Sequence, residues 1–231
     1  MNQHTNIVRI KAVANALGSL SDSVVFIGGA TVSLYPDRVL LDEVRPTNDV
    51  DIIVEVLNYK ERLAIEEKLR NRGFTDDIES GIVCRFRVQG IVVDVMPTKD
   101  ESIGFSNMWY APGFQNSILH QIDSLCSVRI LPAPYFVATK LEAFKGRGNK
   151  DGRTSHDFED IIFVLENRMA IWQEFANAAP NLKKYLQSEF SEFLQIPHFK
   201  EWIDCHVERS TSPSTNRIYS DLEKFVISQD L

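Results

Sequence analysis

The chain is most constrained by the stretch from Val24 to Val56, where an apolar segment, a glycine pair and two closely spaced acids follow one another. Val24–Ile27 predicts a buried strand, and Gly28 and Gly29 come directly after it. A glycine pair after a strand is by itself most often only a tight turn. It also lets the backbone approach a triphosphate closely, with the N-terminal amides of a following helix at Ala30–Leu34 facing the phosphates.

Two acids then lie on one predicted strand, Asn48–Val56. Because successive side chains on a strand point to opposite faces, Asp49 and Asp51 share a face, with their Cα atoms about 6–7 Å apart. Such a pair is often only a solvated strand end, but two carboxylates this close repel each other unless a cation lies between them. Mg²⁺, or alternatively Mn²⁺, prefers carboxylate oxygens. Thr47, just before the strand, either offers its hydroxyl to a phosphate or caps the start of the strand.

A third acid lies inside a later apolar segment. Ile91–Met96 predicts another buried strand, and Asp94 is the charged residue within it. A carboxylate in such a setting needs a partner, because burying an unpaired charge is costly. We therefore expect Asp94 to join Asp49 and Asp51 as a metal ligand from a neighbouring strand.

The strand before this one supplies two basic residues. Gln89-Gly90 predicts a tight hairpin that joins Ile91–Met96 to a preceding strand at Ile82–Val88. Arg85 and Arg87 alternate on one face of that strand. They either neutralise the acids or face solvent.

These residues, together with a downstream block that reads ATKLEAFKGRG and then SHDFEDIIFVL, resemble the nucleotidyltransferase superfamily. Within it, they resemble the AbiEii-like, toxin-type nucleotidyltransferases. The resemblance covers roughly residues 24–166. Its main departure is the 19-residue gap between Gly29 and Asp49, which is longer than is usual in the superfamily and suggests an enlarged loop at Tyr35–Pro46.

The downstream block carries further residues that the resemblance assigns to the nucleotide. Lys140 matches the family lysine that contacts the nucleotide phosphates, and Asp157 matches an acid that orients this lysine or the nucleotide. Asp160 is implied to be structural, and His156 stands where the family pattern has a basic residue. Without the resemblance, a lysine beside a buried stripe usually pairs or extends to solvent, and acids at a helix N-terminus usually complement the helix dipole.

The order of predicted elements indicates an α+β protein. We expect a mixed sheet of the nucleotidyltransferase type, flanked by helices, in a catalytic domain at residues 1–131. Residues 132–231 are expected to form a helical domain, because from Ala170 onward the sequence predicts helices separated at Pro180, Pro197 and Pro213. This domain is expected to close the nucleotide cleft. The aromatic residues of this half are best explained as packing between helices.

The net charge of −7 argues against a long nucleic-acid-binding face but not against an enzyme that engages one end of an RNA. A local basic cluster exists, and its alternative explanation is a solvated loop. The cluster consists of Lys140, Lys145, Arg147, Lys150 and Arg153.

The composition also bears on the compartment. The sequence has no apolar run long enough to span a bilayer and no pattern typical of a signal peptide. Its three cysteines are an odd number without a CxxC pair, which favours free thiols in a reducing environment. We therefore expect a cytoplasmic protein with no membrane partner.

The expected reaction is transfer of a nucleoside monophosphate from an NTP to an acceptor hydroxyl, with Asp49, Asp51 and Asp94 as catalytic metal ligands. Gly28, Gly29, Thr47, Lys140 and Asp157 would bind the nucleotide. The resemblance implies a toxin whose acceptor is RNA, typically a tRNA end, restrained by a cognate antitoxin. Two alternatives stay open: a small-molecule nucleotidyltransferase of the antibiotic-modifying kind, and a catalytically silent nucleotide-binding or protein-interaction module.

Overall fold

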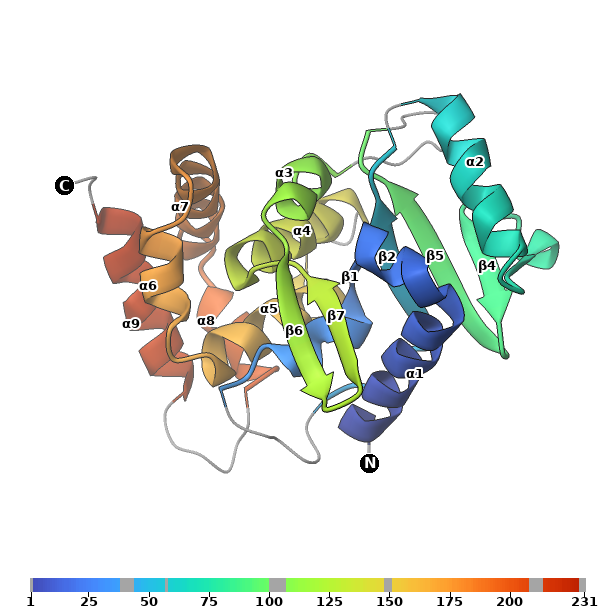
Figure 1. Ribbon diagram of the computed structural model, residues 1–231. Coiled ribbons are helices and arrows are strands. Elements are labelled where there is room, and N and C mark those ends of the chain that lie inside the picture. Colours follow the sequence, from blue (N-terminus) through green and yellow to red (C-terminus); the bar gives the residue numbers. More distant parts are fainter. Residues whose placement is uncertain are drawn as a thin grey trace. The chain divides into compact units, whose positions relative to one another are not determined.

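The computed structural model describes residues 2–37, 44–56, 58–99, 107–147, 151–207 and 214–228. The chain divides into two compact units. The first unit contains residues 1–34 and 39–132, and the second contains residues 35–38 and 133–231. The first unit carries the sheet, and the second is helical (Figure 1).

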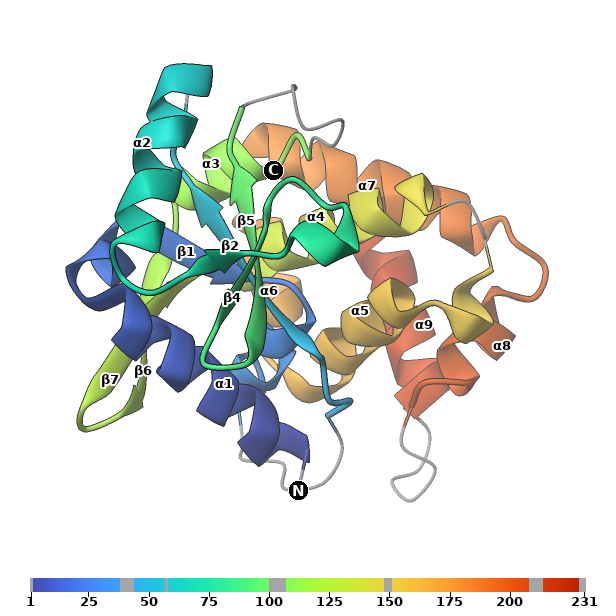
Figure 2. The same cartoon turned by 90° about the vertical axis from the view of Figure 1, so that its right-hand side faces the viewer.

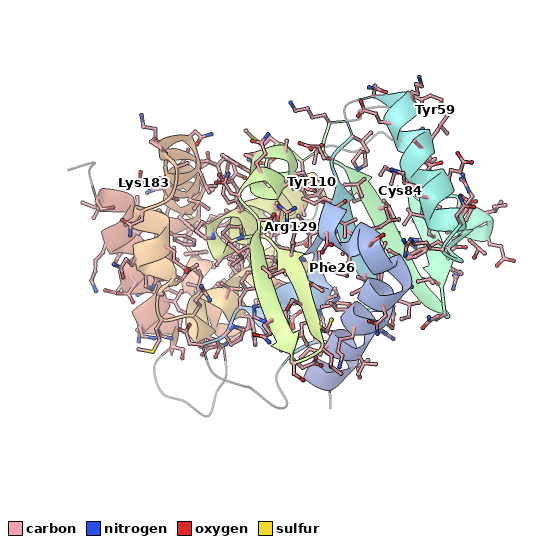
Figure 3. The ribbon with its side chains drawn as sticks, viewed as in Figure 1. Phe26, Tyr59, Cys84, Tyr110, Arg129 and Lys183 are labelled. Carbon is pink, nitrogen blue, oxygen red and sulfur yellow. The ribbon has the colours of Figure 1, made fainter. Side chains whose placement is uncertain are left out.

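The first unit is built on one mixed sheet of seven strands in the order β3-β4-β5-β2-β1-β7-β6. The central strand, β2, is parallel to β5 and antiparallel to β1. Phe26 of β1 is fully buried in this unit (Figure 3). The strands are β1 (Val24–Ile27), β2 (Asp49–Val54), β3 (Thr75–Asp76), β4 (Arg85–Val88), β5 (Ile91–Pro97), β6 (Ile118–Asp123) and β7 (Cys126–Ile130).

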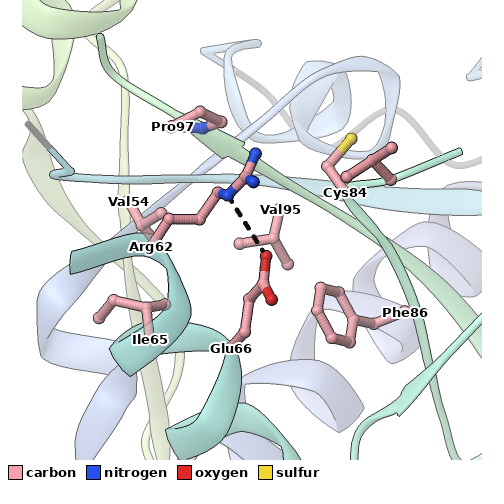
Figure 4. Close-up of a pocket in the computed structure, with 9 residues that line it drawn as sticks. Val54, Arg62, Ile65, Glu66, Cys84, Phe86, Val95 and Pro97 are labelled. Carbon is pink, nitrogen blue, oxygen red and sulfur yellow. Dashed lines mark ion pairs between the residues drawn. The ribbon is translucent and has the colours of Figure 1, made fainter. Parts of the chain in front are cut away.

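Helices cover this sheet. The α-helices of the first unit are α1 (Asn2–Leu17), α2 (Tyr59–Arg70) and α3 (Tyr110–Gln115), and the 3-10 helices are η1 (Gly18–Ser23), η2 (Gly29–Leu34) and η3 (Ile78–Ser80). Helix α2 packs over the apolar side chains of β2, β5 and β4, where a small pocket lies beneath it (Figure 4). Two charged residues of α2, Arg62 and Glu66, line this pocket and form an ion pair with each other at 3.6 Å.

The strand predictions are correct in the centre of the sheet and less accurate at its margins. Val24–Ile27 is confirmed to the residue, and β2 and β5 lie within one or two residues of their predicted bounds. The strand expected at Ile82–Val88 begins only at Arg85, and the margin strand β3 has just two residues because η3 begins at Ile78. The edge strand β6 was not predicted. The expected helix at Ala30–Leu34 is a six-residue 3-10 helix, η2.

The second unit is a helical assembly, and Figure 2 shows α5 and α9 in contact within it. Ser155 caps α5, where its hydroxyl accepts a hydrogen bond from the backbone N–H of Phe158 at 3.3 Å. The aromatic side chains of this unit pack against one another, as expected. Its helices are α4 (Ala133–Gly146), η5 (Gly152–Thr154), α5 (His156–Asn167), α6 (Ile171–Ala176), α7 (Pro180–Leu194), α8 (Phe199–Asp204) and α9 (Ser214–Ile227).

The predicted α+β class, with an N-terminal mixed sheet followed by C-terminal helices, is therefore confirmed. Cys84, Cys126 and Cys205 are free thiols. Within the described ranges, no helix has both the length and the apolar character needed to cross a bilayer.

Candidate functional site

The three acids singled out in the sequence lie on the same face of two adjacent strands. Asp49 and Asp51 are two residues apart on β2, and Asp94 of β5 is aligned with Asp51 in the parallel register. Residues aligned in this way project to the same side of a sheet. The opposite side of these strands carries apolar residues such as Val54 and Val95, which face α2. The acids therefore lie on the sheet face away from α2.

Gly28 places a backbone turn directly against one of these acids. It follows β1, whose last residue, Ile27, is aligned with Asp51 in the antiparallel register. A Cβ atom at Gly28 would lie 1.9 Å from Oδ2 of Asp51, and Gly28 has a φ of 73°. Both features require glycine, since an added methyl group would overlap the carboxylate and a positive φ disfavours other residues.

The turn after Gly28 is closed by its own backbone and by one hydroxyl. The backbone N–H and the hydroxyl of Thr31 donate to the carbonyl of Gly28, at 3.2 and 2.9 Å. The chain then continues as η2, in which Gly29 is buried. Because η2 is a short 3-10 helix, it does not provide the aligned peptide dipoles with which the N-terminus of a longer α-helix favours a phosphate.

Thr47 caps the start of β2. Its hydroxyl donates to the carbonyl of Asp49 at 3.0 Å, and its backbone N–H donates to Oδ1 of Asn6 at 3.1 Å. The amide nitrogen of Asn6 donates in turn to the carbonyl of Arg45 at 3.1 Å. Of the two roles considered for Thr47, the structure shows the capping role, and a contact with phosphate stays a prediction.

Arg85 lies between two of the acids. Its Nε and Nη2 atoms donate to Oδ1 and Oδ2 of Asp94 at 2.8 and 2.7 Å, so that both carboxylate oxygens are engaged. The Nη2 atom also lies 3.9 Å from Oδ2 of Asp49. The hydrogen bond with Asp94 and the charges of Asp94 and Asp49 raise the pKa of the Arg85 guanidinium above its ordinary value.

Arg87 has a different partner. It pairs with the buried carboxylate of Asp77 at 2.9 Å. Of the two arginines that share a face of β4, therefore, Arg85 neutralises the acids and Arg87 does not. The sequence signal for this assignment is the register of the hairpin, in which Arg85 is directly opposite Asp94.

Cys84 lies close to the acids without being a reactive thiol. Burial, followed by the negative charge of Asp94, raises the pKa of the Cys84 thiol to about 11. Figure 3 labels its position. A thiol with such a pKa is protonated at neutral pH and is a poor nucleophile or metal ligand.

The donor set suits a hard divalent cation, since three carboxylates share one face, and a guanidinium already lies between two of them as a stand-in cation. Among the residues that the structure describes, however, no three His, Cys, Asp or Glu side chains are gathered closely enough to hold a metal ion together. Because Asp94 is bound to Arg85 through both oxygens, a metal ion that used Asp94 would have to displace this guanidinium.

In the second unit, Lys140 is buried among acids. Its ammonium lies 2.6 Å from Oδ2 of Asp160 and 3.2 Å from Oδ1 of Asp157, and Arg147 approaches Asp157 at 3.0 Å. The pairing of Lys140 with Asp157 agrees with the orienting role that the resemblance implies, and Asp160 shares in it. His156 is exposed and pairs with Glu159.

The other cations of the basic cluster are also paired within the second unit. Lys145 lies 2.6 Å from Glu189, and Arg153 lies 2.7 Å from Asp151. Lys150 is outside the described residues, as is part of the predicted loop at Tyr35–Pro46. The paired members are better described as a network of ion pairs than as a free basic surface.

Comparisons with known proteins identify the fold of this chain. No protein-family model matches the sequence, and no curated protein matches it. Among solved structures, the fold is similar to the crystal structure of an antigenic nucleotidyltransferase-like protein from Paracoccidioides brasiliensis. The TM-score is 0.51 and the sequence identity 16%, over 91% of this chain and 97% of that chain. The chain therefore has a nucleotidyltransferase-like fold.

Proposed function

We propose that the protein is a metal-dependent nucleotidyltransferase that moves a nucleoside monophosphate from an NTP to an acceptor hydroxyl. One observation carries this proposal: Asp49, Asp51 and Asp94 share one face of adjacent strands beside Gly28, in a nucleotidyltransferase-like fold. A fold alone hosts many functions, so the argument depends on these side chains.

Asp49 and Asp51 are proposed to hold Mg²⁺ or Mn²⁺, and Asp94 is proposed to complete the site once Arg85 has released it. The bound metal would neutralise the triphosphate and lower the pKa of the acceptor hydroxyl. The residues of the chain supply position: Gly28 lets the turn after β1 approach Asp51. Catalysis would come mainly from orientation and charge neutralisation.

Lys140 and Asp157 are proposed to act on the nucleotide phosphates. The ammonium of Lys140 is held by two carboxylates of α5, which fixes its position. A compact ammonium neutralises phosphate as a point charge. This role is supported by the resemblance of the block around these residues, and Lys140→Gln should weaken NTP binding.

The acceptor is proposed to be RNA, with a tRNA end as the first candidate, in a toxin restrained by an antitoxin. This part of the proposal is supported by the resemblance to AbiEii-like proteins. The paired state of Lys145 and Arg153 gives it no added support. A small-molecule acceptor of the antibiotic type therefore stays the second candidate.

Incubation of the protein with total RNA and each labelled NTP, in the presence of Mg²⁺ or Mn²⁺, tests the proposal. We expect label to enter RNA, and we expect Asp49→Ala and Asp94→Ala to abolish transfer while NTP binding persists. The matched control is Asp123→Ala, which removes a surface carboxylate that pairs with Lys11. Transfer by the Asp94→Ala variant at the wild-type rate would contradict the assignment.

Growth assays separate the candidates. A toxin should slow growth on expression, and Asp49→Ala should relieve the effect. An antibiotic-modifying enzyme should leave growth unaffected and turn over purified drug. A binding module should be stabilised by NTP but release no pyrophosphate with any acceptor.

A further inference from the structure

We propose that Arg85 is a built-in cation that competes with the divalent metal ion for Asp94 and Asp49. The guanidinium binds both oxygens of Asp94 at 2.7 and 2.8 Å and lies 3.9 Å from Asp49. It therefore occupies the space in which a metal would have to meet these carboxylates. This inference rests on the proposed function for the identity of the competing ion.

Competition follows from the position of the guanidinium. A metal ion that bridged Asp94 and Asp49 would have to lie where Nη2 of Arg85 lies, 2.7 Å from Oδ2 of Asp94 and 3.9 Å from Oδ2 of Asp49. A bidentate pair of this kind is among the stronger interactions in proteins because two charge-assisted hydrogen bonds form in parallel. The pair is also sheltered, with side-chain exposures of 23% for Arg85 and 14% for Asp94. Metal binding must therefore break it.

The register of the sheet makes Arg85 the residue suited to this role. Arg85 is directly opposite Asp94 in the antiparallel pair of β4 and β5, and Asp94 is aligned with Asp51 in the parallel pair of β5 and β2. The guanidinium therefore emerges on the same face as the acids. Its neighbour on that face, Arg87, binds Asp77.

The acid site then has two states. In one, Arg85 neutralises Asp94 and the three carboxylates coexist without a metal. In the other, the metal replaces the guanidinium, which is released toward the ligand that the metal carries. Two oxygens of an NTP phosphate can accept the paired N–H groups of the planar guanidinium. Metal and NTP should therefore favour each other's binding.

Direct metal binding tests the competition without measuring transfer. Free Mn²⁺ is measured by electron paramagnetic resonance during titration of wild type, Arg85→Gln and Arg87→Gln, with Mn²⁺ as the sole ligand. Arg85→Gln should bind Mn²⁺ about tenfold more tightly, which corresponds to about 1.4 kcal/mol. Arg87→Gln removes the same charge from the same strand face and should change the affinity less than threefold.

Two further variants protect the test against a folding defect. Arg85→Lys keeps the charge but lacks the bidentate geometry, so its Mn²⁺ affinity should lie between those of wild type and Arg85→Gln. Adding Asp94→Asn to Arg85→Gln should remove the gain, because the carboxylate that was freed is then absent. Circular dichroism spectra matching that of wild type show which variants are folded.

The proposal is overturned if folded Arg85→Gln and Arg85→Lys bind Mn²⁺ no more tightly than Arg87→Gln does. It is also overturned if the gain persists after Asp94→Asn. Failure of the proposed function gives a different result: Mn²⁺ affinity rises as described in Arg85→Gln, and no variant transfers a nucleotide to any acceptor. The two failures are therefore distinguishable.

Discussion

Replacing Gly28 with alanine would insert a methyl group into the carboxylate of Asp51. The added Cβ would lie 1.9 Å from Oδ2 and 2.7 Å from Cγ of Asp51, distances at which the atoms overlap. The residue would also have to keep a φ of 73°, which alanine disfavours. Gly28→Ala therefore combines a backbone cost with a steric cost.

The two costs can be estimated separately. A residue with a Cβ in the left-handed region loses about 1–2 kcal/mol. Displacing the carboxylate of Asp51 from its position resembles overpacking, which costs about 1–3 kcal/mol. The free energy of unfolding should therefore fall by about 2–5 kcal/mol, a large part of the total of about 5–15 kcal/mol that is usual for a folded protein.

Gly81 offers a matched control for the backbone cost. Its φ is 69°, close to that of Gly28, and a Cβ atom there would meet nothing within 4 Å. Urea unfolding of Gly81→Ala should therefore show a loss of about 1–2 kcal/mol, and the difference between the two variants measures the overlap with Asp51. In an Asp51→Gly background, which also removes the Cβ atom 3.0 Å away, Gly28→Ala should cost close to what Gly81→Ala costs.

Equal destabilisation by Gly28→Ala and Gly81→Ala in the wild-type background would refute the reasoning, because it would mean that the carboxylate of Asp51 does not lie against Gly28. The same variants can be tested for Mn²⁺ binding. Gly28→Ala should weaken it, since the methyl group forces a proposed ligand out of position, whereas Gly81→Ala should not.

Two further predictions concern one partly buried and one buried ionisable group. Because the pKa of Cys84 is raised from 9.0 to about 11, its thiol should be alkylated by iodoacetamide at pH 8 about a hundredfold more slowly than an ordinary cysteine, followed by mass spectrometry against the exposed Cys205. The neutral thiol is favoured in the folded state, so its stabilising contribution is complete below pH 9 and is lost as the pH rises through about 11. Equal alkylation of both cysteines in the folded protein would contradict this. Lys140→Met leaves two buried carboxylates without their ammonium and should lower the free energy of unfolding by about 3–5 kcal/mol at pH 7 in urea unfolding. A loss below about 1 kcal/mol, the usual value for an exposed ion pair, would contradict the buried pairing.

The placement of the acids was accessible from the sequence because alternation along a strand is a local property. Asp49 and Asp51 had to share a face once β2 was recognised, and the apolar neighbours of Asp94 identified β5. The two-residue turn at Gln89-Gly90 was also recognisable, because glycine favours such turns. In the structure, both residues adopt the positive φ that the turn needs.

The partner of Arg85 was not accessible in the same way. Alternation placed Arg85 and Arg87 on one face, and the hairpin register put Arg85 opposite Asp94, but the partners stayed open because they depend on the rotamer of a long side chain. The edge strand β6 was missed for a related reason. It is exposed along much of its length and mixes polar with apolar residues, so it lacks the apolar signal of β1 and β5.

The hairpin at Gln89-Gly90 has a consequence for how the charge of this face could change over evolutionary time. Its length alone sets which side chains of β4 stand over the carboxylates. Inserting one residue in the turn would slip the pairing by one position and send the guanidinium of Arg85 to the α2 side, with Phe86 taking its place. A single codon gained or lost could thus switch the surface above the acids from cationic to aromatic, with Phe86 leaving its buried position beneath α2.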